Sequence, residues 1–115
     1  MAWLLRDDEV LASLEVADTH RARARGLLGR DGVDGLDGLE GALLLPQTRS
    51  IHSLGMRFPI DVAYLDADLV VIHTFRLAPH RLTRPRAGVR QVIEAEAGAF
   101  ARWNLVVGDQ LQVRP

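Results

Sequence analysis

Asp61 is the residue whose type and position most clearly suggest chemistry. It stands in the stretch SIHSLGMRFPIDVAYLD, residues 50–66, at the start of an apolar run that reads as a strand. Alternation along a strand places Asp61, Ala63 and Leu65 on one face. Because both faces are apolar, this carboxylate needs an arginine, backbone N–H donors or a bound proton. Asp61 is therefore either a structural partner that fixes the preceding proline loop or the polar floor of a pocket.

His52 is the nearest candidate for a metal ligand or a general base. The next histidine is His73, in a different predicted strand, and no HxH or HExxH motif is present. The chain has no cysteine, which excludes thiolate metal sites, disulfides and cysteine nucleophiles. We therefore expect neither a metal site nor a cofactor.

Arg23 and Arg30 are seven residues apart, which places them on one side of a predicted helix. Gly26 between them removes a side chain and would let a ligand or another backbone approach. The pair could hold a carboxylate or a phosphate, or it could form a solvated face beside close helix–sheet packing. If Gly29 ends the helix, Arg30 is free to reach Asp61 instead.

Residues 76–90, RLAPHRLTRPRAGVR, form a basic, proline-punctuated loop without an acid. Its cationic residues are Arg76, His80, Arg81, Arg84, Arg86 and Arg90. Fifteen residues are long for a passive connection, so the loop is interpreted as a ligand-facing flap or as a solvated loop. A nucleic-acid surface would interleave aromatic residues, and this segment has none, which disfavours that partner.

The elements that position these residues are mostly strands. We predict an antiparallel or mixed, barrel-like, compact sheet of about seven strands with one longer and one short helix, an α+β class rich in β-structure. The predicted strands are 2–6, 10–16, 42–46, 59–66, 69–77, 89–98 and a last one in 106–113. The longer helix is expected to begin at Asp18 or Thr19 and to run to Leu28, and the short one to cover 99–105.

Val10, Ala12, Leu14 and Val16 are expected to alternate onto one face of their strand, and Phe100 and Trp103 to lie in the core. The 115 residues are expected to form a single domain.

Composition restricts the choice of partner. The net charge is −1, so no overall field attracts nucleic acid or a membrane surface. All 14 basic residues are arginine, which we attribute to codon usage in a GC-rich genome. The apolar patch near the start is shorter than the roughly 7 to 15 residues of a secretory segment or the about 20 of a membrane span. We therefore expect a cytoplasmic protein with no membrane partner.

Four ordered motifs together resemble the Domain of Unknown Function 192 family. They are RARGLLGR (23–30), IHSLGMRFPIDV (51–62), VIEAEAG (92–98) and GDQL (108–111), and the match spans roughly residues 15–113. The positions that match the family pattern are Arg23, Gly26, Leu27, Arg30, Pro59, Ile60, Asp61, Glu94, Gly98, Gly108 and Asp109. The resemblance implies a small β-rich fold and no particular reaction.

The chain departs from that pattern at several positions, and IHSLGM (51–56) replaces the usual Phe-Trp-Met-Lys-Asn-Thr. Leu28 stands where the family usually has methionine, His52 where it has tryptophan, and Met56 where it has threonine. Tryptophan cannot bind a metal, but it shares with histidine a flat ring with a polar edge. His52 is therefore interpreted as a stacking wall.

The leading hypothesis is a binding module. Its shallow pocket would be bordered by His52 and Met56, floored by Asp61 and supplied with positive charge by Arg23 and Arg30. The expected ligand is a small anionic or zwitterionic molecule or a peptide segment.

Glu94 is a further candidate for binding, although a cross-strand pair with an arginine would also explain it. The alternative is an enzyme that uses Asp61 with Glu94 or His52 in acid–base chemistry, although no nucleophile elbow, phosphate loop or metal motif supports it. A third hypothesis is nucleic-acid binding through residues 76–90. We make no prediction of the oligomeric state.

Overall fold

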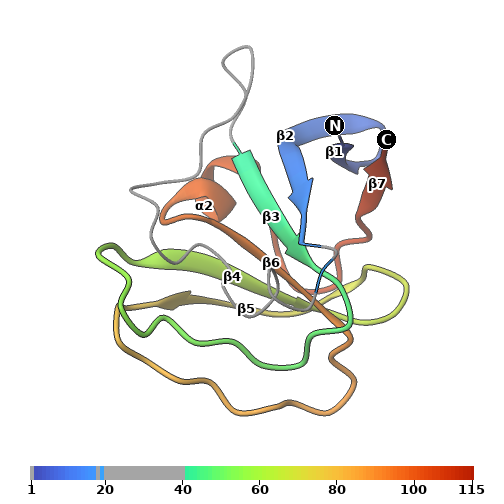
Figure 1. The fold of residues 1–115 in the computed structure, drawn as a ribbon. Helices are drawn as coiled ribbons and strands as arrows, with labels where there is room; N and C mark the ends of the chain where they lie inside the picture. The colour runs from blue at the N-terminus through green and yellow to red at the C-terminus, as the bar shows by residue number, and fades with distance from the viewer. Residues whose placement is uncertain (1, 18, 20–40) are drawn as a thin grey trace.

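The computed structural model describes residues 2–17, 19 and 41–115 (Figure 1). This part of the chain forms seven strands and one short helix. The elements are β1 Ala2–Arg6, β2 Glu9–Val16, β3 Gly41–Leu45, β4 Ile60–Leu65, β5 Val71–Leu77, β6 Gln91–Glu96, α2 Ala99–Trp103 and β7 Gln112–Arg114. The predicted longer helix falls almost entirely outside the described residues, whereas the predicted strands and the short helix are confirmed.

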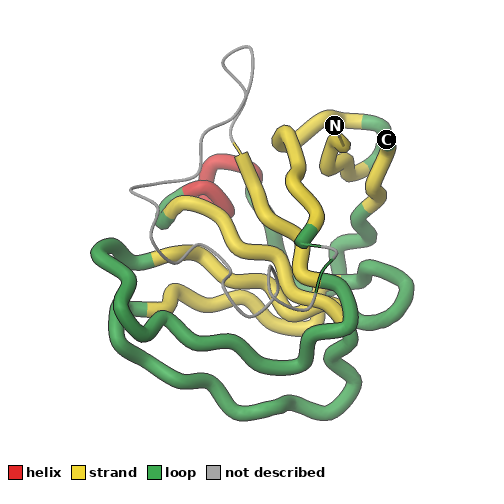
Figure 2. Tube along the Cα trace, in the orientation of Figure 1, coloured by secondary structure: helices red, strands yellow, loops and turns green. Residues whose placement is uncertain are grey.

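The seven strands form one sheet in the order β5-β4-β6-β3-β2-β1-β7. All neighbours are antiparallel except β2 and β3, which are parallel, so the predicted mixed, β-rich sheet is confirmed. The predicted barrel-like closure is not confirmed. The edge strands β5 and β7 do not pair (Figure 2). An isolated bridge between Val70 and Gln110 links the segments that precede these two strands.

Side-chain acids shape the tight turns of the two hairpins. Asp7 and Asp8 join β1 to β2 with φ angles of 51° and 65°, a left-handed conformation that aspartate tolerates better than most residues. In the β4–β5 turn, Asp66 Oδ1 accepts hydrogen bonds from the N–H groups of Asp68 (2.8 Å) and Val70 (3.0 Å). Such local side-chain bonds stabilise the chain reversal.

The predicted alternation in β2 fails at Val10, because Val10 and Ala12 pair with the consecutive residues Leu5 and Leu4 where the register shifts. Val10 and Val16 are 42% and 41% exposed. The four residues from Leu11 to Leu14 are all buried. At the register shift Leu11 has no partner on β1, and it joins the same hydrophobic cluster as Ala12 and Leu14.

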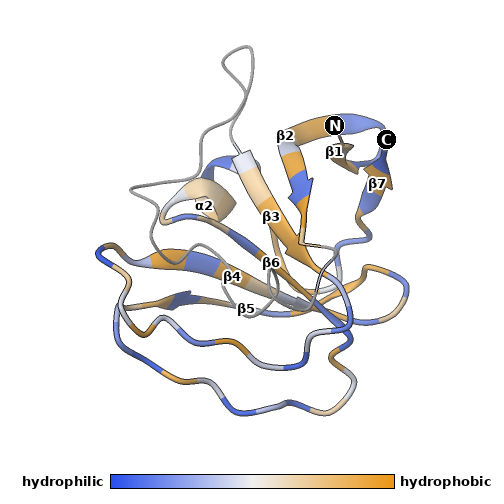
Figure 3. Ribbon diagram, in the orientation of Figure 1, coloured by the Kyte–Doolittle hydropathy of each residue, from blue (hydrophilic) through white to orange (hydrophobic). Residues whose placement is uncertain are grey.

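Each face of the sheet carries its own hydrophobic core. Alternation along β4 divides its side chains, with Ala63 and Leu65 in one cluster and Ile60, Val62 and Tyr64 in the other. The first cluster contains Phe100 and Trp103 of α2, whose rings lie 5.5 Å apart, and their predicted core placement is confirmed. Apolar colour follows the strands, while the connecting loops are mostly polar (Figure 3).

Two long loops cover the second core. Residues 46–59 and 78–90 run side by side beneath β4 and β5 (Figure 1). Backbone hydrogen bonds connect them, from Ser53 N to Arg81 O (2.8 Å) and from Thr83 N to Ile51 O (3.0 Å). Met56 and Val89 are buried beneath this layer. Among the helices of the described residues, none is long and apolar enough to cross a membrane.

Candidate functional site

Asp61 acts as a structural anchor at the start of α2. Its Oδ2 accepts hydrogen bonds from the backbone N–H groups of Gly98 (2.9 Å) and Phe100 (3.1 Å). Its Oδ1 accepts one from Arg76 Nε at 3.3 Å. The carboxylate is 8% exposed, whereas the Arg76 side chain is 59% exposed, so the two backbone donors contribute more than the solvent-screened ion pair. These contacts explain why an acid stands at the edge of the core.

The structure does not assemble the predicted pocket around Asp61. Asp61 lies on the α2 face of the sheet, whereas Met56 is 3% exposed within the core on the opposite face. Glu94 is 1% exposed and pairs in register with Val62 and Leu43, so it also lies on the face opposite Asp61. The sheet itself separates Asp61 from Met56 and Glu94.

The remaining predicted site residues do not form a second cluster in the described chain. His52 is partly exposed, its backbone bridges to Leu82, and its Nδ1 accepts a 3.3 Å hydrogen bond from Leu54 N. Arg23 and Arg30 lie outside the described residues. Within residues 2–17, 19 and 41–115, no three histidine or acidic side chains gather in a manner suited to a metal ion.

A different site lies where the basic loop covers β4 and β5. We call it the arginine-loop hollow; it is a shallow depression of about 380 Å³. Its walls come from the two strands on one side and from the loop on the other, and they are formed by Tyr64, His73, Phe75, Thr83, Arg84, Pro85 and Arg86. A volume of this size is within the range of pockets that take small organic molecules.

Three aromatic rings form the floor of the arginine-loop hollow. His73 and Phe75 stack with ring centroids 5.4 Å apart and planes 27° apart. Tyr64 meets Phe75 edge-on at 5.1 Å. The strand register explains the cluster, because Tyr64 lies directly opposite His73 and Val62 opposite Phe75. The floor is therefore held by paired strands rather than by loops.

The hydroxyl group of Tyr64 is the unusual polar atom of this floor. Tyr64 is 3% exposed, and within the described structure its Oη is buried and makes no hydrogen bond. Leaving a buried hydroxyl without a partner costs about 1–3 kcal/mol, so native proteins seldom do so. Tyr64 thus keeps an unused hydrogen-bond donor beside the hollow that its side chain lines.

Arg84 and Arg86 supply positive charge at the rim. Both side chains are exposed, and within the described chain neither makes an ion pair or a side-chain hydrogen bond. None of the described residues that line the hollow is acidic. Few backbone hydrogen bonds hold this segment in the described structure. The nearest ones run from Thr83 N to Ile51 O and from Val89 N to Arg86 O. Two guanidinium groups can therefore turn toward a bound anion without breaking an existing contact.

A second depression, which we call the α2 hollow, lies across the edge of the sheet. It has a volume of about 530 Å³ and is lined by Asp61, Thr74, Phe75, Arg76, Phe100, Ala101, Asn104, Leu105 and Val106. Phe75 lines both hollows, since β5 is the last strand at this edge. Asp61 therefore does border a hollow, but one on the other side of β5 from the arginine loop.

Sequence reasoning identified the arginines of the arginine-loop hollow but missed its aromatic floor. The segment 76–90 contains no aromatic residue, and the rings come instead from the preceding hairpin. The available signal was the spacing of His73 and Phe75, two residues apart on a predicted strand, together with Tyr64 on the strand before it.

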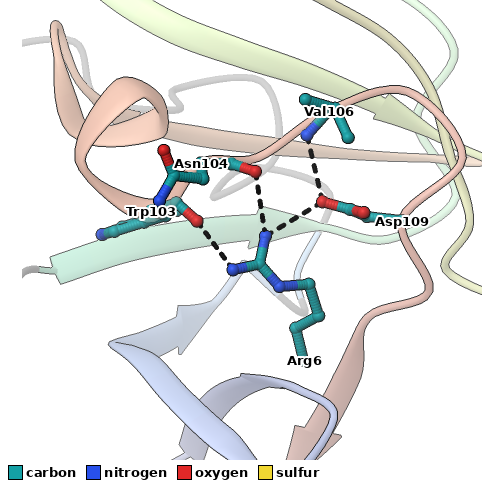
Figure 4. Close-up of polar contacts among 5 residues, drawn as sticks. All are labelled: Arg6, Trp103, Asn104, Val106 and Asp109. Atoms are coloured by element: carbon teal, nitrogen blue, oxygen red, sulfur yellow. Dashed lines mark hydrogen bonds and ion pairs between the residues drawn. The ribbon is translucent and has the colours of Figure 1, made fainter.

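The Gly108–Asp109 motif has a structural role instead of lining a hollow. Asp109 Oδ2 accepts hydrogen bonds from Val106 N and from Arg6 Nη1, both at 3.0 Å (Figure 4). The same guanidinium donates to the carbonyl oxygens of Trp103 (2.7 Å) and Asn104 (3.1 Å). Arg6 thus satisfies carbonyl groups at the end of α2 and ties β1 to the C-terminal segment.

Comparison with known proteins gives a consistent family assignment. The family model DUF192, described as Uncharacterized ACR, matches residues 3–113. A UPF0127 protein of Thermococcus sibiricus is 32% identical over 102 residues, which cover 85% of this chain and 64% of that protein. A UPF0127 protein of Pyrococcus abyssi is 31% identical over 103 residues, covering 86% of this chain and 84% of that protein. The chain spans less than two thirds of the length of the Thermococcus relative.

Two crystal structures share the fold. One is a protein of unknown function from Novosphingobium aromaticivorans, with a TM-score of 0.77 and 22% identity, covering 96% of this chain and 82% of that one. The other is a protein from Sinorhizobium meliloti with a TM-score of 0.77 and 18% identity, covering 97% and 91% of the two chains. At such identities the likeness extends to the fold alone.

Proposed function

The chain belongs to the DUF192 family, as its motifs predicted, and we propose that it is a binding module that takes a carboxylate in the arginine-loop hollow. One observation supports this proposal above the others. Two arginines that have no acidic partner among the described residues stand at the rim of a hollow, and its aromatic floor holds a buried hydroxyl that lacks a partner in the same part of the chain. Each part of that arrangement favours an anion with an attached apolar group.

The arginines select the charge of the ligand. A guanidinium group binds a carboxylate through two parallel hydrogen bonds, which are stronger than bonds between neutral groups. Arg84 and Arg86 are free of ion pairs in the described chain, so a ligand would not have to displace a competing acid. We therefore expect anions to bind in preference to neutral molecules of the same shape.

The aromatic floor selects the body of the ligand. The stacked rings of His73 and Phe75 present partly buried apolar surface to the hollow. A planar or apolar group packed against them gains from burial and ring stacking. A ligand that accepts a hydrogen bond from Tyr64 Oη would satisfy a donor that is buried without a partner in the described structure.

Benzoate is a suitable first probe, with benzamide as a neutral control of the same shape. Titration followed by ¹⁵N-edited NMR should give binding by benzoate that is at least tenfold stronger than that by benzamide. Arg84→Ala combined with Arg86→Ala should weaken benzoate binding at least tenfold. Arg81→Ala, an exposed arginine of the same loop outside the hollow, should change it less than twofold.

Two results would contradict the proposal. One is equal binding of benzoate and benzamide, and the other is an equal loss in the double variant and in Arg81→Ala. Nucleic acid is the competing ligand, because β4 and β5 supply the aromatic rings that the basic loop lacks. A ten-nucleotide oligothymidylate that bound more tightly than benzoate, and lost affinity steeply with salt, would favour that reading instead.

A further inference from the structure

The outer edge of β5 is open along most of its length. β5 is the last strand of the sheet and pairs with β4 on one side only. On its other side, Val71 N donates to Asp109 O (2.9 Å) and Val71 O accepts from Gly108 N (2.8 Å). Beyond Val71, no described segment pairs with this edge, so residues 72–77 present backbone groups to an incoming strand.

The two hollows flank this edge on opposite faces of the sheet. His73 lines the arginine-loop hollow, whereas Thr74 and Arg76 line the α2 hollow, and Phe75 borders both. This division follows from the alternation of side chains along β5. A strand added beside β5 would alternate in the same way, so its successive side chains would enter the two hollows in turn.

We propose that an extended acidic peptide segment binds as an additional strand along β5. The proposal rests on the proposed function, because the peptide's acidic side chains are the carboxylates that enter the arginine-loop hollow. Strand addition supplies affinity through backbone hydrogen bonds and specificity through pockets for alternate side chains. The edge of β5 offers both the backbone groups and the pockets for alternate side chains, whereas the arginine-loop hollow alone does not offer both.

Charge complementarity identifies the chemistry of the peptide. The two hollows together are lined by Arg76, Arg84 and Arg86, and by one acid, Asp61. Asp61 is nearly buried and bonded to two backbone N–H groups, so it presents little charge to a ligand. An acidic segment therefore meets unopposed positive charge at the arginine-loop hollow.

The α2 hollow selects the alternate side chains. Apart from its strand residues, its walls include Phe100, Leu105 and Val106, of which Val106 is 58% exposed. Covering this apolar surface favours an apolar side chain. The segment that fits both hollows therefore alternates acidic and apolar residues over about six positions, the length of the open edge.

The hexapeptide acetyl-Glu-Val-Glu-Leu-Glu-Val-amide tests this pattern. Its control, acetyl-Glu-Glu-Glu-Val-Val-Leu-amide, has the same composition and charge but groups the acids together. Measured by anisotropy of a fluorescein-labelled peptide, the alternating peptide should bind at least tenfold more tightly. N-methylation of every second backbone nitrogen should abolish binding for one of the two alternating sets and leave it nearly unchanged for the other, because only one set faces β5.

Variants of the protein test the contribution of the arginine charges, and amide exchange tests the pairing with β5. Arg84→Glu with Arg86→Glu should lower the affinity for the alternating peptide at least tenfold, and Arg81→Glu should lower it less than threefold. Bound peptide should also slow the exchange of backbone amides between residues 72 and 77. The amides that point away from β4 have no backbone partner in the described structure, so the slowing should be confined to that alternate set.

The outcomes distinguish this inference from the proposed function. Equal affinity of the two hexapeptides, or equal effects of the two N-methylated sets, would overturn strand addition while benzoate binding could still uphold the proposed function. Absence of benzoate binding with strand-specific peptide binding would overturn the proposed small-carboxylate site and leave the edge as the binding element. Absence of any hexapeptide binding overturns the inference.

Discussion

Replacing Tyr64 by phenylalanine is the most revealing single perturbation. It removes one oxygen atom and keeps the ring that packs edge-on against Phe75 at 5.1 Å. The oxygen is buried and makes no hydrogen bond in the described structure. Most tyrosine-to-phenylalanine changes in a core destabilise a protein because a bond is lost. For Tyr64→Phe we expect the protein to become more stable.

The size of the effect follows from two opposing terms. Removing a buried hydroxyl that has no partner should raise the free energy of unfolding by about 1–3 kcal/mol. The small void left by one oxygen atom should lower it by about a few tenths of a kcal/mol. We expect Tyr64→Phe to raise the free energy of unfolding by about 1–2 kcal/mol. For a chain of 115 residues that corresponds to a rise in Tm of about 4–8 °C.

The same change should weaken ligand binding. If the bound carboxylate accepts a hydrogen bond from Tyr64 Oη, its loss should lower the affinity for benzoate by about tenfold, or about 1.4 kcal/mol. Urea unfolding of the free protein and a benzoate titration give the two numbers. Destabilisation of the free protein together with unchanged benzoate affinity would refute the reasoning, because the hydroxyl would then have a structural partner and no contact with ligand.

The structural contacts give three further predictions. Asp61→Asn should lower the free energy of unfolding by about 2–3 kcal/mol, since the charged acceptor of two backbone N–H groups is lost; a loss below about 0.5 kcal/mol in urea would show that these bonds contribute little. Arg6→Ala should cost about 2–3 kcal/mol by thermal unfolding, because carbonyls at the end of α2 lose their donor, and Arg114→Ala, an exposed control, should cost less than about 0.5 kcal/mol. Gly98→Ala should cost about 1–2 kcal/mol, because Gly98 has φ 97°; an unchanged Tm would show that the backbone relaxes without strain.

Much of the sheet could be predicted because its signals are local. Alternating apolar residues and short polar turns identified both hairpins, β3 and β6, and the helix at 99–105 followed from the spacing of Phe100 and Trp103. The exposure of Val10 in β2 could not be predicted in this way. It depends on the register shift between β1 and β2, which is a property of the assembled sheet.

The candidate site was harder to predict because it depends on which face each residue occupies. The need of Asp61 for an arginine or backbone donors was anticipated, but its arginine is Arg76, which the hairpin register places directly opposite. Glu94 and Met56 were grouped with Asp61, although the sheet separates them. The position of Arg84 above the aromatic rings depends on hydrogen bonds between two long loops, and no local pattern encodes these.

The central claim is that Arg84 and Arg86 bind a carboxylate above the rings of β4 and β5. A benzoate titration followed by ¹⁵N-edited NMR tests it directly, with the double Arg84→Ala, Arg86→Ala variant measured alongside. We expect saturating shifts concentrated at residues 73–75 and 83–86, which are lost in the double variant. Shifts centred elsewhere, or a titration identical in the two proteins, would contradict it.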